Sequence, residues 1–243
     1  MKLTLSPTEQ GIFASATGTT LGASAAQRVY ENLRQRIVNL ELKPDVTLSR
    51  TELADHYSVS QTPIREAMQK LEQDGLVRIF PQSRTVVARI DVKQLHETQF
   101  LRVAIETEVV RQLAEHPDPA ALHRARIFLN MQEALRDSPD QADMFSDLDK
   151  AFHRALFEGV GMIGLHIYLG GRLGHLARCQ RLELPKAGKM NGVLDGHRAV
   201  LDAIETGDPD VAAREMRKHL TGTILRISVL QKEFPDYFTS EQL

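Results

Sequence analysis

The sequence has little of what secreted and membrane proteins usually carry. Cys179 is the only cysteine among 243 residues, so no internal disulfide can form. The first 30 residues lack the basic start and apolar core of a signal peptide. The most apolar stretch, residues 160–169, is too short to span a bilayer and contains His166. We therefore expect a globular cytoplasmic protein without a membrane partner.

A strong charge of either sign is also missing, because the formal net charge is −2. The charge is uneven, with ten basic and eight acidic side chains in residues 24–90 but nineteen and twenty-three in residues 91–243. The net charge argues against a broad coating of nucleic acid by this protein. With a basic excess of only two on residues 24–90, phosphate affinity would depend on single arginines and on dimerisation. The arginines in question are Arg50, Arg65, Arg78 and Arg84. For each one, an ordinary solvated surface charge is the alternative.

Residues 51–68 predict two short helices that meet at a tight turn. Apolar side chains recur at helical spacing on both, at positions 53, 54 and 57 and at positions 64, 67, 68 and 71. Ser60 is a candidate N-cap, and Pro63 is tolerated because first-turn amides have no partner within the helix. Gln61, Thr62, Arg65 and Gln69 form a polar stripe on the second helix. A helix-turn-helix presents such a stripe to base edges in the major groove.

The flanking residues predict a wing and a third helix. Gly75 ends the second helix, and two β-prone runs, residues 77–80 and 85–87, are separated by the hairpin of residues 81–84. A helix with one apolar face is predicted to begin near Ser24 and to end before Pro44. From spacing alone, an ordinary helical surface with a β-hairpin remains the alternative to DNA binding.

The residues of this region resemble a known family. The segments Glu52-Leu53-Ala54, Val59 to Met68, Leu71-Glu72 and Asp74 to Val77 look like the winged helix-turn-helix signature of GntR-family transcription regulators. The resemblance implies double-stranded operator DNA as a partner. The residues that we expect to contact it are Arg50, Ser60, Gln61, Thr62, Arg65 and Arg84.

Three positions depart from the pattern of that family. Most relatives carry arginine where this chain has Gln61, and often a second arginine at Thr51. Arginine reads guanine, whereas glutamine pairs best with adenine, so the usual operator should not be assumed. At the wing tip, Ser83-Arg84 replaces a common glycine, and Arg84 could reach phosphate or the minor groove.

The rest of the chain predicts a different architecture. Residues 1–22 are rich in Ser, Thr, Gly and Ala, so we expect a mobile arm, followed by a winged helix-turn-helix domain over residues 23–90. Residues 91–243 predict an all-α antiparallel bundle of about six helices and make the protein mainly α. The expected helices span residues 91–115, 120–136, 144–158, 162–184, 193–206 and 209–230. Asp91 and Asp208 are the expected N-caps at two of the helix starts.

Four residues of this bundle form a candidate metal site. Asp149 and His153 lie at i and i+4, so both project from one face, although a surface Asp–His pair is the simpler interpretation. His197 and His219 fall on apolar stripes of the last two helices, at similar distances from the turn at Gly207. A short turn makes these helices antiparallel, and the two histidines should lie level inside the bundle. A core histidine bonded to a carboxylate is the alternative for each.

These residues, together with Gly196 to Ile204, Gly207-Asp208 and Met216-x2-His219-Leu220, resemble the C-terminal ligand-binding domain of FadR-like GntR regulators, the FCD type. The resemblance implies a divalent metal held by Asp149, His153, His197 and His219. Zinc or nickel suits such an imidazole-rich set, and open coordination positions suit a carboxylate. We expect Arg102 to bind the acid group of that effector, and an i, i+4 ion pair with Glu106 is the alternative role for this arginine. Arg172 and His175 are weaker candidates for the same pocket.

The sequence thus predicts a dimeric, ligand-responsive transcription regulator, typically a repressor released by a small organic acid at a metal-containing pocket. We expect no catalysis, because no general base with a motif accompanies the metal set. A metal-dependent enzyme is one alternative, since a metal with open positions can activate water. A pure metal sensor fused to a DNA-binding head is the other.

Overall fold

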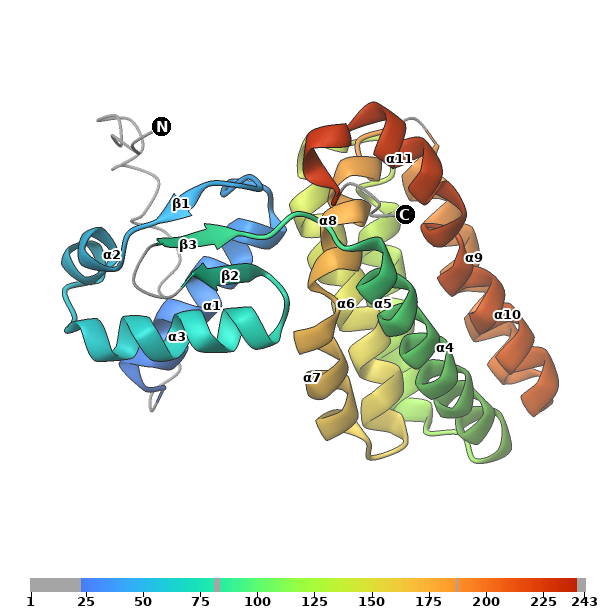
Figure 1. Ribbon diagram of the computed structural model, residues 1–243. Coiled ribbons are helices and arrows are strands. Elements are labelled where there is room, and N and C mark those ends of the chain that lie inside the picture. Colours follow the sequence, from blue (N-terminus) through green and yellow to red (C-terminus); the bar gives the residue numbers. More distant parts are fainter. Residues whose placement is uncertain (1–22, 81–83, 187, 240–243) are drawn as a thin grey trace. The chain divides into compact units, whose positions relative to one another are not determined.

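The structure, a computed structural model, describes residues 23–80, 84–186 and 188–239 (Figure 1). The expected N-terminal arm and residues 81–83 of the expected hairpin lie outside the described residues. The chain divides into two compact units, with the main boundary between Arg89 and Ile90 and with Val38–Leu40 assigned to the second unit. The fold is mainly helical with a small sheet in the first unit, which confirms the predicted fold class.

The first unit is a winged helix-turn-helix. Its elements are α1 (Ala25–Val38), β1 (Thr47–Leu48), α2 (Arg50–Tyr57), α3 (Gln61–Gln73), β2 (Val77–Phe80) and β3 (Arg84–Val87). The strands form an antiparallel sheet in the order β1-β3-β2. The apolar faces of α1, α2 and α3 pack together with the sheet around Leu33, Ile64, Leu71 and Val87. Burial of these side chains holds α2 and α3, the two helices of the helix-turn-helix, at a fixed angle.

Short-range signals explain why α2 and α3 begin and end where they do. The Ser49 hydroxyl accepts a hydrogen bond from the Glu52 amide and caps α2. Ser58 adopts a left-handed conformation with φ 52°, which turns the chain sharply before α3. Gly75, with φ 72°, follows α3 and lets the chain turn into β2, as the sequence predicts.

The strand β1 was not predicted. It contains only two residues, and they pair with Thr85 and Val86 of β3. A run of two residues has no recognisable period, so only its pairing with a distant strand defines it. This strand completes the sheet and brings Ser49, the cap of α2, next to the wing.

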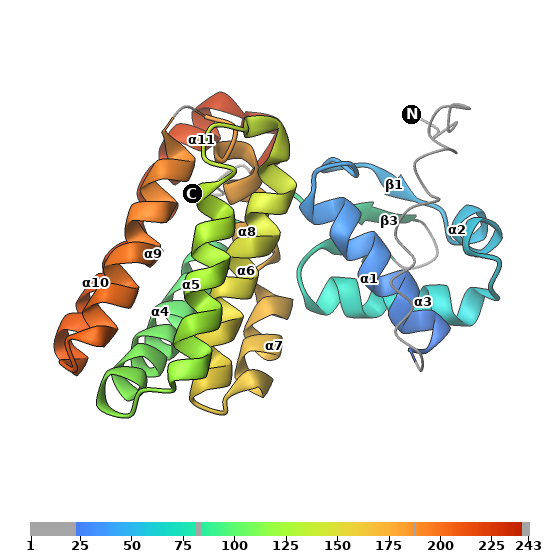
Figure 2. The ribbon, with the colours of Figure 1, turned by 180° about the vertical axis from the view of Figure 1, so that it is seen from behind.

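The second unit is a bundle of helices. Its α-helices are α4 (Val92–Glu115), α5 (Pro119–Glu133), α6 (Ala142–Gly159), α7 (Ile163–Arg172), α8 (Gly174–Glu183), α9 (Lys189–Glu205), α10 (Pro209–Thr221) and α11 (Ile227–Glu233). Short 3-10 turns lie at residues 139–141, 224–226 and 235–237. Figure 2 shows the α9–α10 hairpin on one side of the bundle and α7 on the other. No helix within the described residues is long and apolar enough to cross a membrane.

Aspartate caps mark three helix starts in this unit. Asp91 accepts a hydrogen bond from the Gln94 amide, and Asp208 accepts from the amides of Asp210 and Val211, which confirms both predicted caps. Asp118 caps α5 in the same way. The antiparallel α9–α10 hairpin follows from the short turn at Gly207, where φ is 74°.

Two of the six expected helices are in fact broken. The segment 162–184 forms α7 and α8, separated at Leu173, because Gly170, Gly171 and Gly174 weaken the helix within one and a half turns. The segment 209–230 forms α10, a 3-10 turn and α11, with the break after Thr221. Gly222 and its β-branched neighbours have low helix propensity and explain the second break.

Phe238, near the end of the described residues, pairs with the residue that opens the second unit. Ile90 forms a parallel bridge with Phe238, and its amide donates to the Tyr237 carbonyl oxygen at 2.7 Å. Both side chains are buried beside Leu95 and Leu230. The first residue after the winged unit is therefore held by backbone hydrogen bonds and by apolar packing.

Candidate DNA-reading surface and candidate metal centre

The six residues expected to contact DNA are all exposed on the winged unit. Ser60, Gln61 and Thr62 lie at the start of α3, and Arg65 follows on the same outer face, opposite the buried Ile64 and Met68. Ser60 occupies the N-cap position but makes no capping hydrogen bond with its hydroxyl. That hydroxyl is thus not committed to the helix, contrary to the capping role that the sequence predicts.

The start of α3 suits an anionic partner. Its first turn contains no acidic residue, and the unpaired amides at a helix N-terminus carry partial positive charge. Arg50 opens α2, and Arg84 opens β3 with its guanidinium 5.5 Å from the Phe80 ring centroid. The surface therefore offers arginines for phosphate and amide or hydroxyl groups for base edges.

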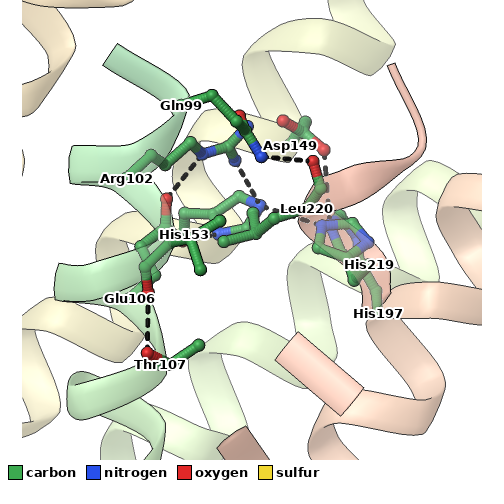
Figure 3. Close-up of polar contacts among 10 residues, drawn as sticks. Gln99, Arg102, Glu106, Thr107, Asp149, His153, His197, His219 and Leu220 are labelled. Carbon is green, nitrogen blue, oxygen red and sulfur yellow. Dashed lines mark hydrogen bonds and ion pairs between the residues drawn. The ribbon is translucent and has the colours of Figure 1, made fainter. Parts of the chain in front are cut away.

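The second unit brings the four predicted metal ligands together inside the bundle (Figure 3). Asp149 and His153 lie on α6, His197 on α9 and His219 on α10. One ligand atom from each residue lies within 4.8 Å of the other three. The Nε2 atoms of His153 and His219 are 3.3 Å apart, and His197 Nε2 is 3.3 Å from Asp149 Oδ1.

These spacings fit a common cation. Two ligands each about 2.1 Å from one ion lie roughly 3.0–4.2 Å apart, so 3.3 Å falls in that range and 4.8 Å is slightly long. The His197 Nδ1 atom lies 2.8 Å from Gln132 Oε1, while the Gln132 amide nitrogen donates to the Phe145 carbonyl oxygen at 3.2 Å. Gln132 thus offers an acceptor, and His197 must donate from Nδ1.

The same contact leaves an acceptor facing an acceptor in the centre of the cluster. Burial lowers the pKa of His197, which favours a neutral ring with a single N–H. Since that N–H points to Gln132, the Nε2 lone pair of His197 faces the carboxylate of Asp149. A cation between these two atoms resolves the conflict. The residues therefore fit a metal on geometry and on hydrogen bonding.

The protonation states of the cluster also suit metal binding. Burial raises the pKa of Asp149, but its polar surroundings, which include the guanidinium of Arg102, outweigh burial and hold the pKa below its usual range. Burial, together with the neighbouring His197 and His153, holds the pKa of His219 well below the ordinary value. An ionised carboxylate and neutral imidazoles are the forms that bind metals.

Gly196 makes room for the ring of His219. A Cβ atom at position 196 would lie 2.5 Å from His219 Nδ1 and 3.2 Å from its Cγ. Such a contact is too short for any side chain other than hydrogen, so α9 and α10 can approach this closely only with glycine at that position. The residue directly before one ligand thus determines where another ligand lies.

A cavity of about 320 Å³ opens beside the cluster. Arg102, Asp149 and His219 line it, together with parts of α9 and the chain around Gly222. Arg102 pairs with Glu106 through Nε at 2.6 Å, and its Nη2 lies 3.2 Å from His153 Nε2. Arg102 therefore forms the expected ion pair with Glu106 and also borders the cavity, and its contact with an effector stays a prediction.

The two weaker effector candidates lie elsewhere in the unit. Arg172 is exposed at the end of α7, with its guanidinium 5.7 Å from the Tyr168 ring centroid. His175 is buried on α8, where its Nδ1 contacts Arg178 at 2.8 Å and the Asp91 amide at 3.3 Å. Neither residue lines the described cavity, so neither lies where it could contact a ligand bound there.

Sequence reasoning missed two polar residues beside the cluster and one in the cavity wall. Glu106 contacts His153, Gln132 contacts His197, and Lys189 lines the cavity while pairing with Glu183 at 2.8 Å. Glu106 was noted only as a partner of Arg102. No local pattern distinguishes a buried glutamine such as Gln132 from an exposed one. Its partner His197 is close in the fold but 65 residues away in the sequence.

Comparison with known proteins agrees with this architecture. The family model for bacterial regulatory proteins of the gntR family matches residues 25–87, and the FCD domain model matches residues 97–222. An HTH-type transcriptional regulator from an unstable DNA locus of Streptomyces ambofaciens is 33% identical over 91% of this chain and 93% of its own length. The HTH-type transcriptional repressor RspR of Escherichia coli is 27% identical over 88% of this chain and 94% of its own.

A solved structure shows the same fold. Escherichia coli McbR/YncC superposes with a TM-score of 0.69 at 19% identity, covering 87% of this chain and 99% of that one. Together with the matched models over both units, these similarities establish that the chain belongs to the GntR family of transcription regulators and carries an FCD domain.

Proposed function

We propose that this regulator is a dimeric cytoplasmic repressor that leaves its operator when a small organic acid binds at a metal-containing pocket. One observation carries the proposal. Arg102 and two of the four candidate metal ligands, Asp149 and His219, line the same cavity. A cation and a guanidinium at one cavity wall are suited to an anionic ligand.

Asp149, His153, His197 and His219 would hold the metal, and their nitrogen-rich set favours zinc or nickel. When bound, the ion supplies positive charge and open coordination positions for an oxygen ligand. Two of the ligands border the cavity, whereas His153 and His197 are buried and do not line it. The open side of the site therefore faces the space in which a ligand can bind.

Arg102 is the side chain that we propose for the acid group. Its Nη2 lies beside His153 Nε2, which has a single lone pair. That lone pair can accept from Arg102 or bind an ion, but it cannot do both. Metal loading therefore leaves an N–H of Arg102 available to a carboxylate, while Nε stays paired with Glu106. This competition predicts that the protein binds the acid better with metal than without it.

Dimerisation follows from how a small winged domain gains affinity. A helix-turn-helix typically binds two half-sites through two copies, and the basic excess of this unit is small. An acid that favours one relative placement of the two reading heads would change the match to those half-sites. The name of the RspR relative supports repression as the direction of control.

The experiment is a thermal-shift screen of hydroxy, sugar and dicarboxylic acids against metal-loaded protein, followed by titration of the best acid against labelled operator. We expect operator affinity to fall by roughly 5- to 150-fold, which corresponds to a coupling of about 1–3 kcal/mol. Chelation of the metal should reduce this response. Unchanged operator affinity at a saturating concentration of acid would show that the pocket is not a switch.

The same assay separates the alternative of a pure metal sensor. In such a protein, adding or removing the ion alone changes operator affinity, and no acid in the screen adds to that change. Varying metal and acid independently therefore tells the two apart. Conversion of the best-binding acid into a product would instead support an enzyme.

A further inference from the structure

We propose that Gln132 and Glu106 are positioning residues that fix the orientation of two metal-ligand imidazoles and so determine metal affinity. This inference rests on the metal half of the proposed function. The two residues come from α5 and α4, neither of which contributes a metal ligand. Both side chains are almost completely buried.

Gln132 orients the His197 ring through a contact with its Nδ1 atom. Its side chain is 0% exposed, and its two polar atoms have different partners, the Phe145 carbonyl oxygen for the amide nitrogen and His197 Nδ1 for the oxygen. Because the Phe145 carbonyl can only accept, the amide cannot be turned around without placing two oxygens together. Gln132 therefore presents an acceptor to Nδ1 and leaves Nε2 of His197 unprotonated toward the centre.

Glu106 does the same for His153 with a charged group. Its Oε2 lies 2.6 Å from His153 Nδ1, and its Oε1 lies 2.6 Å from Arg102 Nε. A carboxylate that accepts from a ring N–H increases the basicity of the opposite nitrogen. One side chain thus orients a metal ligand and also positions the arginine proposed for the acid group.

His219 differs from the other two imidazoles. It lies against Gly196 and lines the cavity, whereas His153 and His197 have an oxygen acceptor behind Nδ1. The side chains of Glu106 and Gln132 therefore orient the buried ligands His153 and His197. His219 is positioned instead by its own helix and by the close approach of α9. Loss of an outer partner should weaken metal binding even though all four ligands remain.

The test compares Zn²⁺ affinity, measured by competition with a chelator, for Gln132→Leu and Gln132→Glu. Both variants lose the donor to the Phe145 carbonyl, but only glutamate keeps an acceptor for His197 Nδ1. We expect a loss of about 10- to 100-fold in Zn²⁺ affinity for leucine. The loss for glutamate should be smaller, because glutamate keeps the acceptor for His197 Nδ1 although its second oxygen meets the Phe145 carbonyl oxygen unless it is protonated. Glu106→Gln should also weaken binding, because it removes the charge behind His153.

A matched control is Thr107→Val. Thr107 is a buried polar residue next to Glu106, and its hydroxyl donates to backbone carbonyl oxygens of its own helix. The substitution should leave Zn²⁺ affinity unchanged. Nitrogen-15 NMR of the metal-free protein adds a readout of the ring protons, and we expect His197 and His153 to carry the proton on Nδ1 in the wild type.

Equal Zn²⁺ affinity in wild type, Gln132→Leu and Gln132→Glu would overturn the role of Gln132, as would equal loss in both variants. Wild-type affinity in Glu106→Gln would do the same for Glu106. These outcomes differ from failure of the proposed metal site itself, in which the wild-type protein would not bind Zn²⁺ at all. In that case the NMR measurement still shows which ring nitrogen of His153 and His197 carries the proton.

Discussion

The two units of this regulator place their functional residues in opposite ways. On the winged unit, the residues expected to contact DNA are exposed, and four of the six lie close together in the sequence, from Ser60 to Arg65. In the helical unit, the candidate metal ligands come from three helices, and the residues that orient them come from two more. The first site depends on a local motif held rigid by its core, and the second depends on the packing of the whole bundle.

This difference predicts where substitutions are tolerated. A change on the exposed face of α3 removes a contact with DNA and leaves the fold intact. A change in the cluster removes a cation that binds only the folded bundle, so binding and stability fall together.

The largest effect is expected for the metal ligands. Alanine at His153, His197 or His219 should lower metal content from about one ion per chain to near zero, because each loss leaves three ligands and an open site. Thermal stability in the presence of Zn²⁺ should fall as well. Elemental analysis and thermal unfolding measure the two effects. The matched control is His96→Ala, an exposed histidine on α4. Full occupancy in all three variants would mean that the cluster is a hydrogen-bonded core.

Gly196→Ala should weaken metal binding without touching a ligand. The new Cβ atom would lie 2.5 Å from His219 Nδ1, so the His219 ring must shift from its present position in the cluster. We expect a loss of about tenfold or more in Zn²⁺ affinity, the scale of a disturbed ligand orientation. Gly192→Ala is the matched control on the same helix, since a Cβ there meets nothing within 4 Å. Identical affinities for the two variants would contradict this explanation of the glycine.

Arg65→Ala should weaken operator binding by about 1–3 kcal/mol if the guanidinium reads a base. The fold should be unaffected because the side chain is exposed on the outer face of α3. A gel-shift titration measures the affinity, and thermal unfolding serves as the control. Wild-type affinity would remove Arg65 from the contact set, and a large loss of stability would break the contrast between the two units.

Gln61→Arg should change the preference for DNA sequence with little change in overall affinity. Arginine pairs with guanine through O6 and N7, whereas glutamine pairs with adenine through N6 and N7. Selection from a random DNA library should therefore show guanine favoured at one position of each half-site. An unchanged consensus would show that Gln61 does not take part in readout.

Much of the fold could be predicted because its signals are local. The apolar periods of α2 and α3, the cap at Asp91 and the restart at Asp208 depend on residues within one or two turns. The strand β1 and the break at Leu173 were missed for the opposite reason. A strand of two residues is defined by pairing, and weak helix formers are tolerated or not according to the surrounding packing.

The candidate metal centre could be predicted only in part. The i, i+4 spacing of Asp149 and His153 and the level positions of His197 and His219 on a hairpin can be read from the sequence. The contact of Gln132 with His197 cannot, because it joins helices 65 residues apart through a side chain with no distinctive pattern. Gly196 carried a usable signal, since a glycine inside a helix is costly unless a neighbour approaches closely.

The most direct test of the proposed metal centre is a crystal structure of the metal-loaded protein with anomalous diffraction at the absorption edge of the bound metal. We expect one anomalous peak per chain, coordinated by Asp149, His153, His197 and His219 and open toward the cavity lined by Arg102. The absence of a peak among these four residues, in protein saturated with Zn²⁺ or Ni²⁺, would contradict this expectation.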